Sequence, residues 1–274
     1  MVATPIGNLA DISLRALALL QHADRVAAED TRVAQRLLDA YGLRKPLLRC
    51  DRHREAQAAE QVTASVAAGE RVAYVSDAGT PGISDPGSRL AAAVRHAGLR
   101  VVPVPGASAV AAALSACGLD LDAGYCFAGF APAAANALRD FLQDALDARR
   151  PTVFFEAPHR LRACLEALHA LAPGSRLVLA KELTKQFETL LDCTPQSALD
   201  WLQADPRRLH GEFVLLLQAG PGAAPVLDAN AAALLRRLAR ELPASRAAAV
   251  AADITGISRE VLYRWLLEHR PPGP

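Results

Sequence analysis

A long loop rich in glycine and proline follows a short apolar run in the first third of the chain. Residues 75–87 read Val-Ser-Asp-Ala-Gly-Thr-Pro-Gly-Ile-Ser-Asp-Pro-Gly, with three glycines, two prolines and two aspartates. Glycine lets the backbone approach a ligand closely, and the carboxylate of Asp77 or Asp85 can meet a cation or a ribose hydroxyl. The alternative is a plain strand-to-helix connection in which Asp85 caps the helix, but the loop is long for that role. We therefore expect a ligand site here.

Two shorter loops of the same kind contain Thr4-Pro5-Ile6-Gly7 and Val104-Pro105-Gly106-Ala107-Ser108. Each follows a predicted strand and opens a predicted helix. Taken singly, Asp11 and Ser108 are explained as helix N-caps. Open α/β sheets bind ligands at the carboxyl ends of their strands, so three such loops at one edge of one sheet would line a common crevice.

Charged residues suited to acid–base chemistry follow other predicted strands. Glu29, Asp30 and Arg32 end one strand, and Asp30 is equally well explained as the N-cap of the next helix. Residues 180–186, which follow another predicted strand, contain Lys181 and Lys185. These are two of the three lysines in a chain that otherwise uses arginine. A retained lysine suggests a need for a compact ammonium or a tunable pKa, although both could be ordinary surface lysines.

A local basic segment offers contacts to phosphate. Residues 44–54 contain five basic side chains, Arg44, Lys45, Arg49, Arg52 and Arg54, against the single acid Asp51. Such a cluster can bind a nucleic-acid backbone, but charge runs are often only solvated faces. The chain as a whole has a formal net charge of +1, so any binding of nucleic acid must be local.

Several kinds of chemistry lack their sequence signals. The chain has no Walker A loop, no G-x-G-x-x-G after a strand, no H-E-x-x-H, no cluster of cysteine and histidine, and no G-x-S-x-G. Nucleoside-triphosphate, dinucleotide, metal and serine-triad chemistry therefore lose support. The five cysteines are dispersed and odd in number, which is typical of reduced thiols. Without a membrane-length apolar run or a leader, we expect a soluble cytoplasmic protein that binds no metal.

Short apolar runs alternate with amphipathic stretches, a pattern that predicts an α/β fold. In the first unit, residues 1–131, we expect a mostly parallel sheet from strands at 26–28, 47–48, 72–75, 101–104 and 125–127 and helices at 13–23, 31–41, 55–68, 87–97 and 108–117. In the second, residues 132–220, we expect helices at 136–149, 159–171 and 196–203 and strands at 152–155, 177–180, 187–191 and 213–217, some of them antiparallel.

The chain after residue 220 has a different composition. Residues 220–225 read Gly-Pro-Gly-Ala-Ala-Pro, a linker composition, and we expect a third, small helical unit at residues 226–274. Within it, a helix at 246–253, a tight turn at 255–257 and a helix capped by Ser258 and ending near Glu268 form a helix-turn-helix pattern.

The chain carries eight motifs in one order: T-P-I-G-N-L-x-D, A-E-D-T-R, S-D-A-G-T-P-x-I-S-D-P-G, P-G-A-S-A, G-F-x-P, F-E-A-P-H-R, E-L-T-K and G-E-F-V-L. Together they closely resemble the ribosomal RNA small subunit methyltransferase I family, part of the tetrapyrrole-methylase superfamily. The resemblance implies two α/β domains with a cofactor cleft between them, plus a small C-terminal helical unit. It also implies a homodimer that transfers a methyl group from S-adenosylmethionine to the ribose 2′-hydroxyl of a cytidine in the decoding region of small-subunit ribosomal RNA.

The resemblance also assigns roles to residues. The cofactor contacts that it implies are Pro5, Gly7, Asp77, Ala78, Gly79, Thr80, Ile83, Ser108, Ala109, Phe154, Phe155, Leu183, Glu212 and Phe213. A ribose hydroxyl is a weak nucleophile, so a base is expected; the candidates are Lys181 with a lowered pKa, Glu29, Asp30 and Glu182. Arg32 and Arg160 could hold phosphate.

The chain departs from the family pattern in places. Met1 to Ala3 form only a stub of the first strand, and Ala134 and Asn136 stand where the family has basic residues after G-F-x-P. Two other functions remain open: methylation of a tetrapyrrole with the same cofactor, and a DNA-binding regulator that uses the C-terminal helices. The basic segment 44–54 and the helical tail argue against the tetrapyrrole, and the weak charge of the tail argues against DNA.

Overall fold

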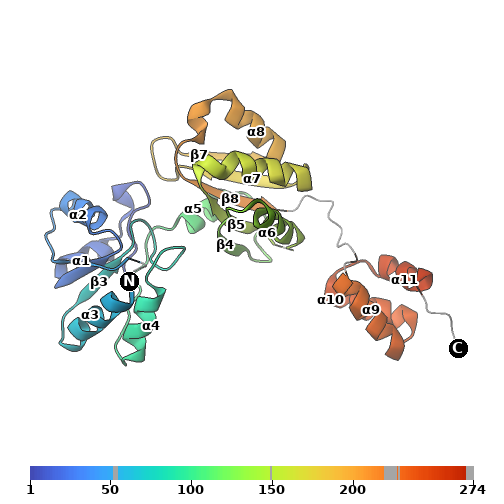
Figure 1. Cartoon of the computed structure of the whole chain (residues 1–274), viewed down its shortest axis with the longest axis horizontal. Coiled ribbons are helices and arrows are strands. Elements are labelled where there is room, and N and C mark those ends of the chain that lie inside the picture. Colours follow the sequence, from blue (N-terminus) through green and yellow to red (C-terminus); the bar gives the residue numbers. More distant parts are fainter. Residues whose placement is uncertain (52–54, 149, 219–226, 228, 270–274) are drawn as a thin grey trace.

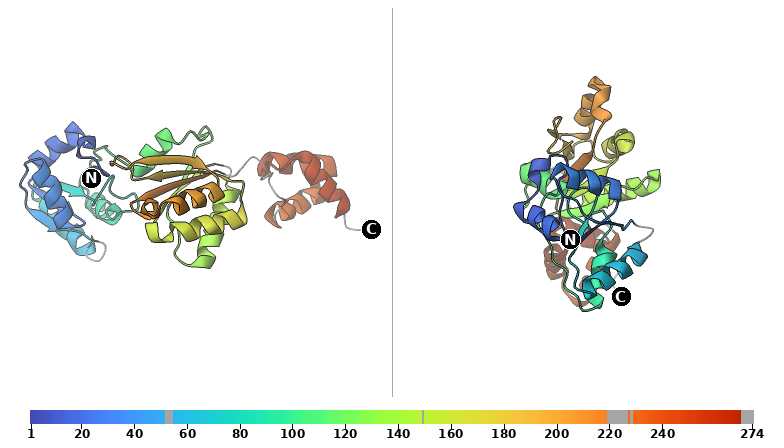
Figure 2. Two further views of the ribbon diagram at one scale, coloured as in Figure 1. Left: turned by 90° about the horizontal axis from the view of Figure 1, so that it is seen from above. Right: turned by 90° about the vertical axis from the view of Figure 1, so that its left-hand side faces the viewer.

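The computed structural model describes residues 1–51, 55–148, 150–218, 227 and 229–269. Two sheets with covering helices form the body, and a helical bundle lies beyond the last strand (Figures 1 and 2). The α/β class and the C-terminal helical unit that the sequence predicts are confirmed.

The first sheet has three parallel strands in the order β2-β1-β3, formed by Leu47–Arg49, Arg25–Ala28 and Val72–Val75. Its two faces pack against different helices. One core contains Leu20 and Leu38 from α1 (Leu14–His22) and α2 (Thr31–Ala40), and the other contains Val62 and Leu90 from α3 (Glu55–Ala67) and α4 (Ser88–His96). A short 3-10 helix, Leu9–Asp11, precedes α1.

The strand predicted at residues 101–104 is wrong. This segment is extended, but its only β-pairing among the described residues is an isolated parallel bridge between Val104 and Val2. Met1 to Ala3 lie between it and β3, and the amide of Val2 donates to the carbonyl oxygen of Tyr74. Pro103 lies within the segment and has no amide hydrogen to donate to a ladder, which opposes regular β-pairing at this point.

The second sheet has the order β4-β5-β8-β6-β7 and is mixed. Its strands are Cys126–Phe130, Thr152–Glu156, Phe213–Gln218, Arg176–Lys181 and Thr189–Cys193, in that order. The antiparallel pairing expected in this unit is confirmed for β5 with β8, β6 with β8 and β6 with β7. One face packs against α6 (Ala135–Asp147), α7 (Pro158–Leu171) and α8 (Pro195–Ala204), and the other against α5 (Ala109–Ala116). A short 3-10 helix, Pro206–Leu209, precedes β8.

The packing places the division between the sheets before residue 131. Strand β4 pairs with β5 of the second sheet, and Val110 and Leu114 of α5 pack on Val153 and Val178 of the same sheet. Apolar alternation predicts that a segment is a strand but not which sheet it joins. The domain boundary at residue 131 stays a prediction, and the pairing of β4 shows that this strand belongs to the second sheet.

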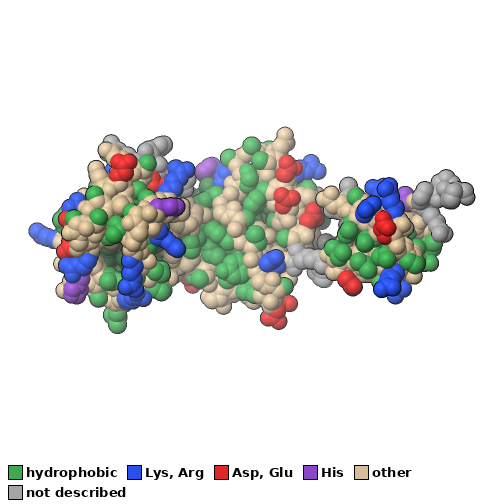
Figure 3. All heavy atoms as spheres, turned by 90° about the horizontal axis from the view of Figure 1, so that it is seen from below, with side chains coloured by type: hydrophobic (Ala, Val, Ile, Leu, Met, Phe, Trp, Pro, Cys, Tyr) green, Lys and Arg blue, Asp and Glu red, His purple; other side chains and the backbone are tan. Residues whose placement is uncertain are grey.

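The C-terminal bundle consists of α9 (Ala229–Glu241), α10 (Ala244–Thr255) and α11 (Arg259–Glu268). Gly256 ends α10 in the left-handed conformation, and the hydroxyl of Ser258 accepts from the amide of Val261 as predicted. These two caps set the turn of the helix-turn-helix. On the face that Figure 3 shows, basic and acidic side chains of the bundle are interspersed.

Candidate active site

Backbone hydrogen bonds join the three glycine- and proline-rich loops. The amide of Thr4 donates to the carbonyl oxygen of Gly79 at 2.9 Å, and the amide of Gly79 donates back to that of Thr4 at 3.1 Å. The hydroxyl of Thr80 donates to the carbonyl oxygen of Ala107 at 2.9 Å. The loops therefore meet as the sequence predicts.

The closeness of these loops depends on glycine at position 79. Gly79 has φ +75°, and a Cβ there would lie 3.1 Å from Cγ2 of Ile6 and 3.6 Å from the carbonyl oxygen of Ala107. The positive φ and the tight contact with Ile6 disfavour any larger residue. Gly79 thus lets the loop at residues 75–87 close on the loop that contains Ile6.

A pocket of about 330 Å³ lies where these loops face the ends of β5 and β8. Its walls are largely apolar, with a few hydroxyl and carboxylate groups. Nine of the predicted cofactor-contact residues line it: Ala78, Gly79, Thr80, Ile83, Ser108, Ala109, Phe155, Glu212 and Phe213. An apolar pocket with a few polar groups is the usual form of a small-molecule site.

The other predicted contact residues lie outside the pocket lining. Pro5 and Gly7 flank Ile6, which does line it, and Leu183 packs in the core beneath α5. The carboxylate of Asp77 accepts from the amide of Asp30 at 3.0 Å. The side chain of Phe154 points to the opposite face of the sheet and stacks edge-on against Phe141, with ring centroids 5.3 Å apart. Because successive side chains of a strand alternate between faces, Phe155 reaches the pocket and Phe154 does not.

A lysine and two carboxylates form a network beside the pocket. The ammonium of Lys185 donates to Oε1 of Glu182 at 2.9 Å and to Oε2 of Glu212 at 3.0 Å. The amide of Glu212 also donates to Oε1 of Glu182 at 2.9 Å. Burial raises the pKa of Glu182, but these hydrogen bonds outweigh it and hold the pKa below its ordinary value. Burial likewise lowers the pKa of Lys185, and its two carboxylate partners more than compensate.

The loop that carries this network is strained. Glu182 and Thr184 have φ of +51° and +67°, a region that residues other than glycine rarely adopt. The hydroxyl of Thr184 is buried with no hydrogen-bond partner among the described residues. Strain of this kind clusters at functional sites.

The remaining predicted catalytic residues are dispersed. Lys181 ends β6 with an exposure of 8%, on the sheet face opposite Ala180, and is not part of the pocket lining. Asp30 caps α2 and pairs with the exposed guanidinium of Arg32 at 2.6 Å. Hydrogen bonds from Arg32 hold the pKa of Asp30 below its usual range. Glu29 lies in the same strand-to-helix turn before α2.

The predicted phosphate contacts differ in accessibility. Arg44 is exposed, and exposed Arg49 pairs with Asp51 at 2.6 Å. Lys45 instead donates to the carbonyl oxygens of Gln21 and Ala23 at the end of α1, so its charge serves the helix terminus. Arg52 and Arg54 lie outside the described residues.

Arg160 is also engaged within the protein. Its guanidinium lies 2.7 Å from Oε1 of Glu156, whose side chain is fully buried. Burial raises the pKa of Glu156, although the amide of Ala157 and Arg160 oppose this. The Arg160 side chain thus compensates a buried carboxylate, and its expected contact with phosphate stays a prediction.

Seven residues that line the pocket have no role predicted from the sequence: Ile6, Ser84, Phe130, Glu156, Ala157, Pro158 and Val214. Ile6 and Phe130 lie within the motifs T-P-I-G and G-F-x-P, so the motifs marked the segments but not the side chains. The glycine before Phe130 within a strand is the one further signal, because such glycines often mark a bulge.

Asp85 does not cap α4, which is the alternative role that the sequence allows for it. Oε1 of buried Glu55 accepts from the amides of Gly87 and Arg89 at 3.1 and 3.2 Å. Asp85 lines the pocket together with Ser84. The long loop is therefore anchored at its far end by a carboxylate from α3.

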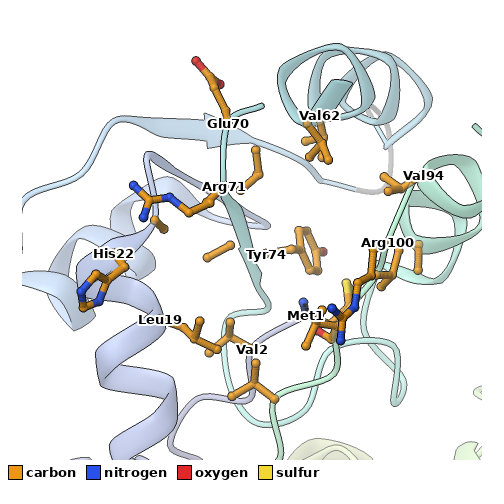
Figure 4. A pocket seen from close by; sticks show the side chains of 18 of the residues that line it. Met1, Val2, Leu19, His22, Val62, Glu70, Arg71, Tyr74, Val94 and Arg100 are labelled. Carbon is orange, nitrogen blue, oxygen red and sulfur yellow. Dashed lines mark hydrogen bonds between the residues drawn. The ribbon is translucent and has the colours of Figure 1, made fainter. Parts of the chain in front are cut away.

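A second cavity, of about 560 Å³, lies within the N-terminal domain (Figure 4). Apolar side chains such as Val62, Tyr74 and Val94 line it together with the extended segment at residues 100–104. The cavity lies where that segment and β3 fail to form a ladder. Its charged residues, among them Arg71 and Arg100, do not form a cluster suited to catalysis.

Among the described residues, no group of three or more histidine, cysteine, aspartate or glutamate side chains could hold a metal ion. Within the same part of the chain, no helix has the length and apolar character needed to cross a membrane.

Comparison with known families defines the class of protein. Residues 1–199 match the family described as Tetrapyrrole (Corrin/Porphyrin) Methylases, and residues 225–270 match the RsmI C-terminal HTH domain. A solved cobalt precorrin-4 methyltransferase is 17% identical with a TM-score of 0.60, covering 79% of this chain and 92% of that one. The chain belongs to the tetrapyrrole methylase family and is a methyltransferase that uses S-adenosylmethionine.

The relatives narrow the family further. The ribosomal RNA small subunit methyltransferase I of Neisseria meningitidis serogroup B is 46% identical over 96% of this chain and 90% of its own length. The protein of that name from Escherichia coli O157:H7 is 44% identical, over 98% of this chain and 94% of its own. Within the tetrapyrrole methylases, the chain belongs to the ribosomal RNA small subunit methyltransferase I family.

Proposed function

We propose that this enzyme methylates the ribose 2′-hydroxyl of a cytidine in the decoding region of small-subunit ribosomal RNA. The observation that carries the proposal is the pocket at which the three loops meet the ends of β5 and β8. The names of the relatives and the matched C-terminal helix-turn-helix domain support RNA as the substrate. No specific feature of the pocket favours a tetrapyrrole.

The residues present fit S-adenosylmethionine. Ile83, Phe155 and Phe213 offer apolar surface for an adenine ring, and the hydroxyls of Thr80 and Ser108 offer polar contacts. When bound, the cofactor supplies an activated methyl group on a sulfonium. The task of the protein is then to align the RNA hydroxyl with that methyl group and to keep other RNA atoms away from it.

We further propose that Glu182 rather than Lys181 assists the ribose hydroxyl. The carboxylate of Glu182 accepts from the amide of Glu212, a pocket residue, and its lowered pKa keeps it ionised at neutral pH. It can therefore accept a hydrogen bond from the ribose hydroxyl, and it takes the proton only as the oxygen–carbon bond forms and makes that hydroxyl strongly acidic. Glu29 and Asp30 remain candidates at the neighbouring turn.

The proposal includes the context in which the enzyme works. Arg32, Arg44 and Arg49 are the exposed cations that would contact RNA phosphates. A homodimer in the cytoplasm is expected. Leu14 is a large apolar side chain exposed at 86%, and a dimer interface would cover surface of this kind.

The test uses purified protein, methyl-labelled S-adenosylmethionine and small ribosomal subunits from cells that lack the modification. Nuclease digestion and mass spectrometry then locate the label. Label on one cytidine ribose supports the proposal, whereas label on a base or no label on RNA despite cofactor binding contradicts it. In the same assay, Glu182→Ala should lose turnover and Lys181→Ala should retain it; the reverse result would restore the lysine as the base.

A further inference from the structure

Strand β4 contains a bulge that changes the direction of one side chain. Its pairing with β5 shifts register between Phe127 and Phe130, and Gly129 lies between them with φ +71°. In a regular strand, residues three positions apart point to opposite faces. Here both Phe127 and Phe130 contact the ring of Phe155 edge-on, with centroids 5.1 and 5.3 Å away. The bulge therefore brings Phe130 to the same face as Phe127.

This placement puts an exposed aromatic ring at the pocket. Phe130 lines the pocket and is 57% exposed, whereas Phe155 behind it is half-buried. An uncovered phenylalanine leaves apolar surface in water that burial by a ligand would remove. Bulges beside active sites commonly serve to aim a side chain.

The size of the pocket limits what else it can hold. At about 330 Å³ it is near the lower end of the roughly 300–1,000 Å³ range of small-molecule sites. It accommodates one small ligand, and a second ring system must rest at its mouth. A reacting ribose hydroxyl lies within about 3.5 Å of the transferred methyl carbon. The base attached to that ribose therefore lies close to the mouth of the pocket.

We propose that Phe130 is the platform on which the base of the target nucleotide stacks during methyl transfer. The inference rests on the proposed function, because it requires an RNA substrate. Sequence-specific recognition of RNA generally uses unstacked bases that stack on aromatic side chains. An enzyme that acts on one nucleotide often unstacks it from the neighbouring bases. Phe130 offers such a ring beside the loops that line the pocket.

The test compares Phe130→Leu, Phe130→Trp and the control Phe187→Leu. Phe187 is an exposed phenylalanine outside the pocket lining, so its substitution matches the loss of apolar surface without touching the site. Two quantities are measured for each variant: the Kd for S-adenosylmethionine by calorimetry and the KM for unmethylated small subunits in the labelled assay. An unchanged cofactor Kd also shows that the variant is folded.

Phe130→Leu should raise the KM for subunits by about tenfold to a hundredfold, the usual loss when a stacking platform is removed. Its Kd for the cofactor should stay within about twofold, and Phe130→Trp should keep the wild-type KM. An unchanged KM, a weakened cofactor Kd, or an equal effect of Phe187→Leu would each overturn the inference. If the wild-type enzyme does not methylate RNA at all, the proposed function itself fails, which is a different result.

Discussion

Gly7 of the first loop lies directly against the side chain of Lys185 from the second domain. A Cβ at Gly7 would collide with Cγ of Lys185 and fall 2.9 Å from Oγ1 of Thr184. Contacts this short cannot persist, so the two loops approach as closely as they do only because residue 7 is glycine. The N-terminal loop thereby fixes the position of the strained segment that carries Glu182.

Gly7→Ala should displace that segment and lower methyltransfer by about tenfold to a hundredfold, because small misplacements of catalytic groups have effects of this size. The rate is measured in single-turnover assays with labelled cofactor. Gly174→Ala is the matched control, since a Cβ there meets no atom within 4 Å. Equal rates for Gly7→Ala and the wild type would show that the loop contact is unimportant.

Lys185→Met should reduce stability by about 1 kcal/mol, a small value because the network is partly solvated. Glu182 has a lowered pKa, so its contribution exists at neutral pH and is lost as pH falls through that pKa. Lys185 has a raised pKa, so its contribution is lost only as pH rises through it. The difference in free energy of unfolding should therefore be constant between about pH 5 and about pH 10 and shrink on both sides.

Denaturant unfolding of both proteins across that pH range checks this prediction. Lys185→Arg keeps the charge, so its free energy of unfolding should stay close to that of the wild type between about pH 5 and about pH 10. A difference that does not vary from acid to alkaline pH would mean that packing of the lysine stem, rather than its charge, accounts for the effect.

The sequence predicts most of the elements because their apolar patterns are local. Two apolar runs predicted as strands are strands in the structure: Leu177 to Ala180 and Phe213 to Leu217. A local pattern does not show which neighbour a segment pairs with: residues 101–104 are also apolar, with a proline at position 103, but form only a bridge to Val2. The apolar residues of β4 likewise do not reveal which sheet they join.

The candidate site shows the same limit. The glycine and proline loops are visible in the sequence, and so is the concentration of lysine near Glu182. The partnership of Lys185 with Glu212 spans 27 residues and arises because Lys181 pairs with Phe213 in the antiparallel register of β6 and β8. The placement of Phe130 depends on a bulge, which shifts every later side chain by one position.

Glu55→Ala should destabilise the protein by about 2 kcal/mol, because it removes a buried cap from the start of α4 and leaves its amides unpaired. The loop at residues 76–87 should then exchange its amide hydrogens faster. Hydrogen exchange and denaturant unfolding measure the two effects. Glu60→Ala changes an exposed glutamate of the same helix and should be neutral; equal effects of the two variants would contradict the capping role.

Arg44→Ala and Lys45→Ala should separate RNA binding from fold stability in two adjacent residues. Arg44 is exposed, so its loss should weaken binding to small-subunit RNA and reduce the slope of log K against log salt by about one. Lys45 donates to two carbonyl oxygens at the end of α1, so its loss should cost about 1 kcal/mol of stability and leave the slope unchanged. Binding titrations over a salt series, with thermal unfolding of each variant, distinguish these roles. A reduced slope for Lys45→Ala would return this lysine to the RNA-binding surface, because an ammonium fully engaged by the helix end releases no counterion from the RNA.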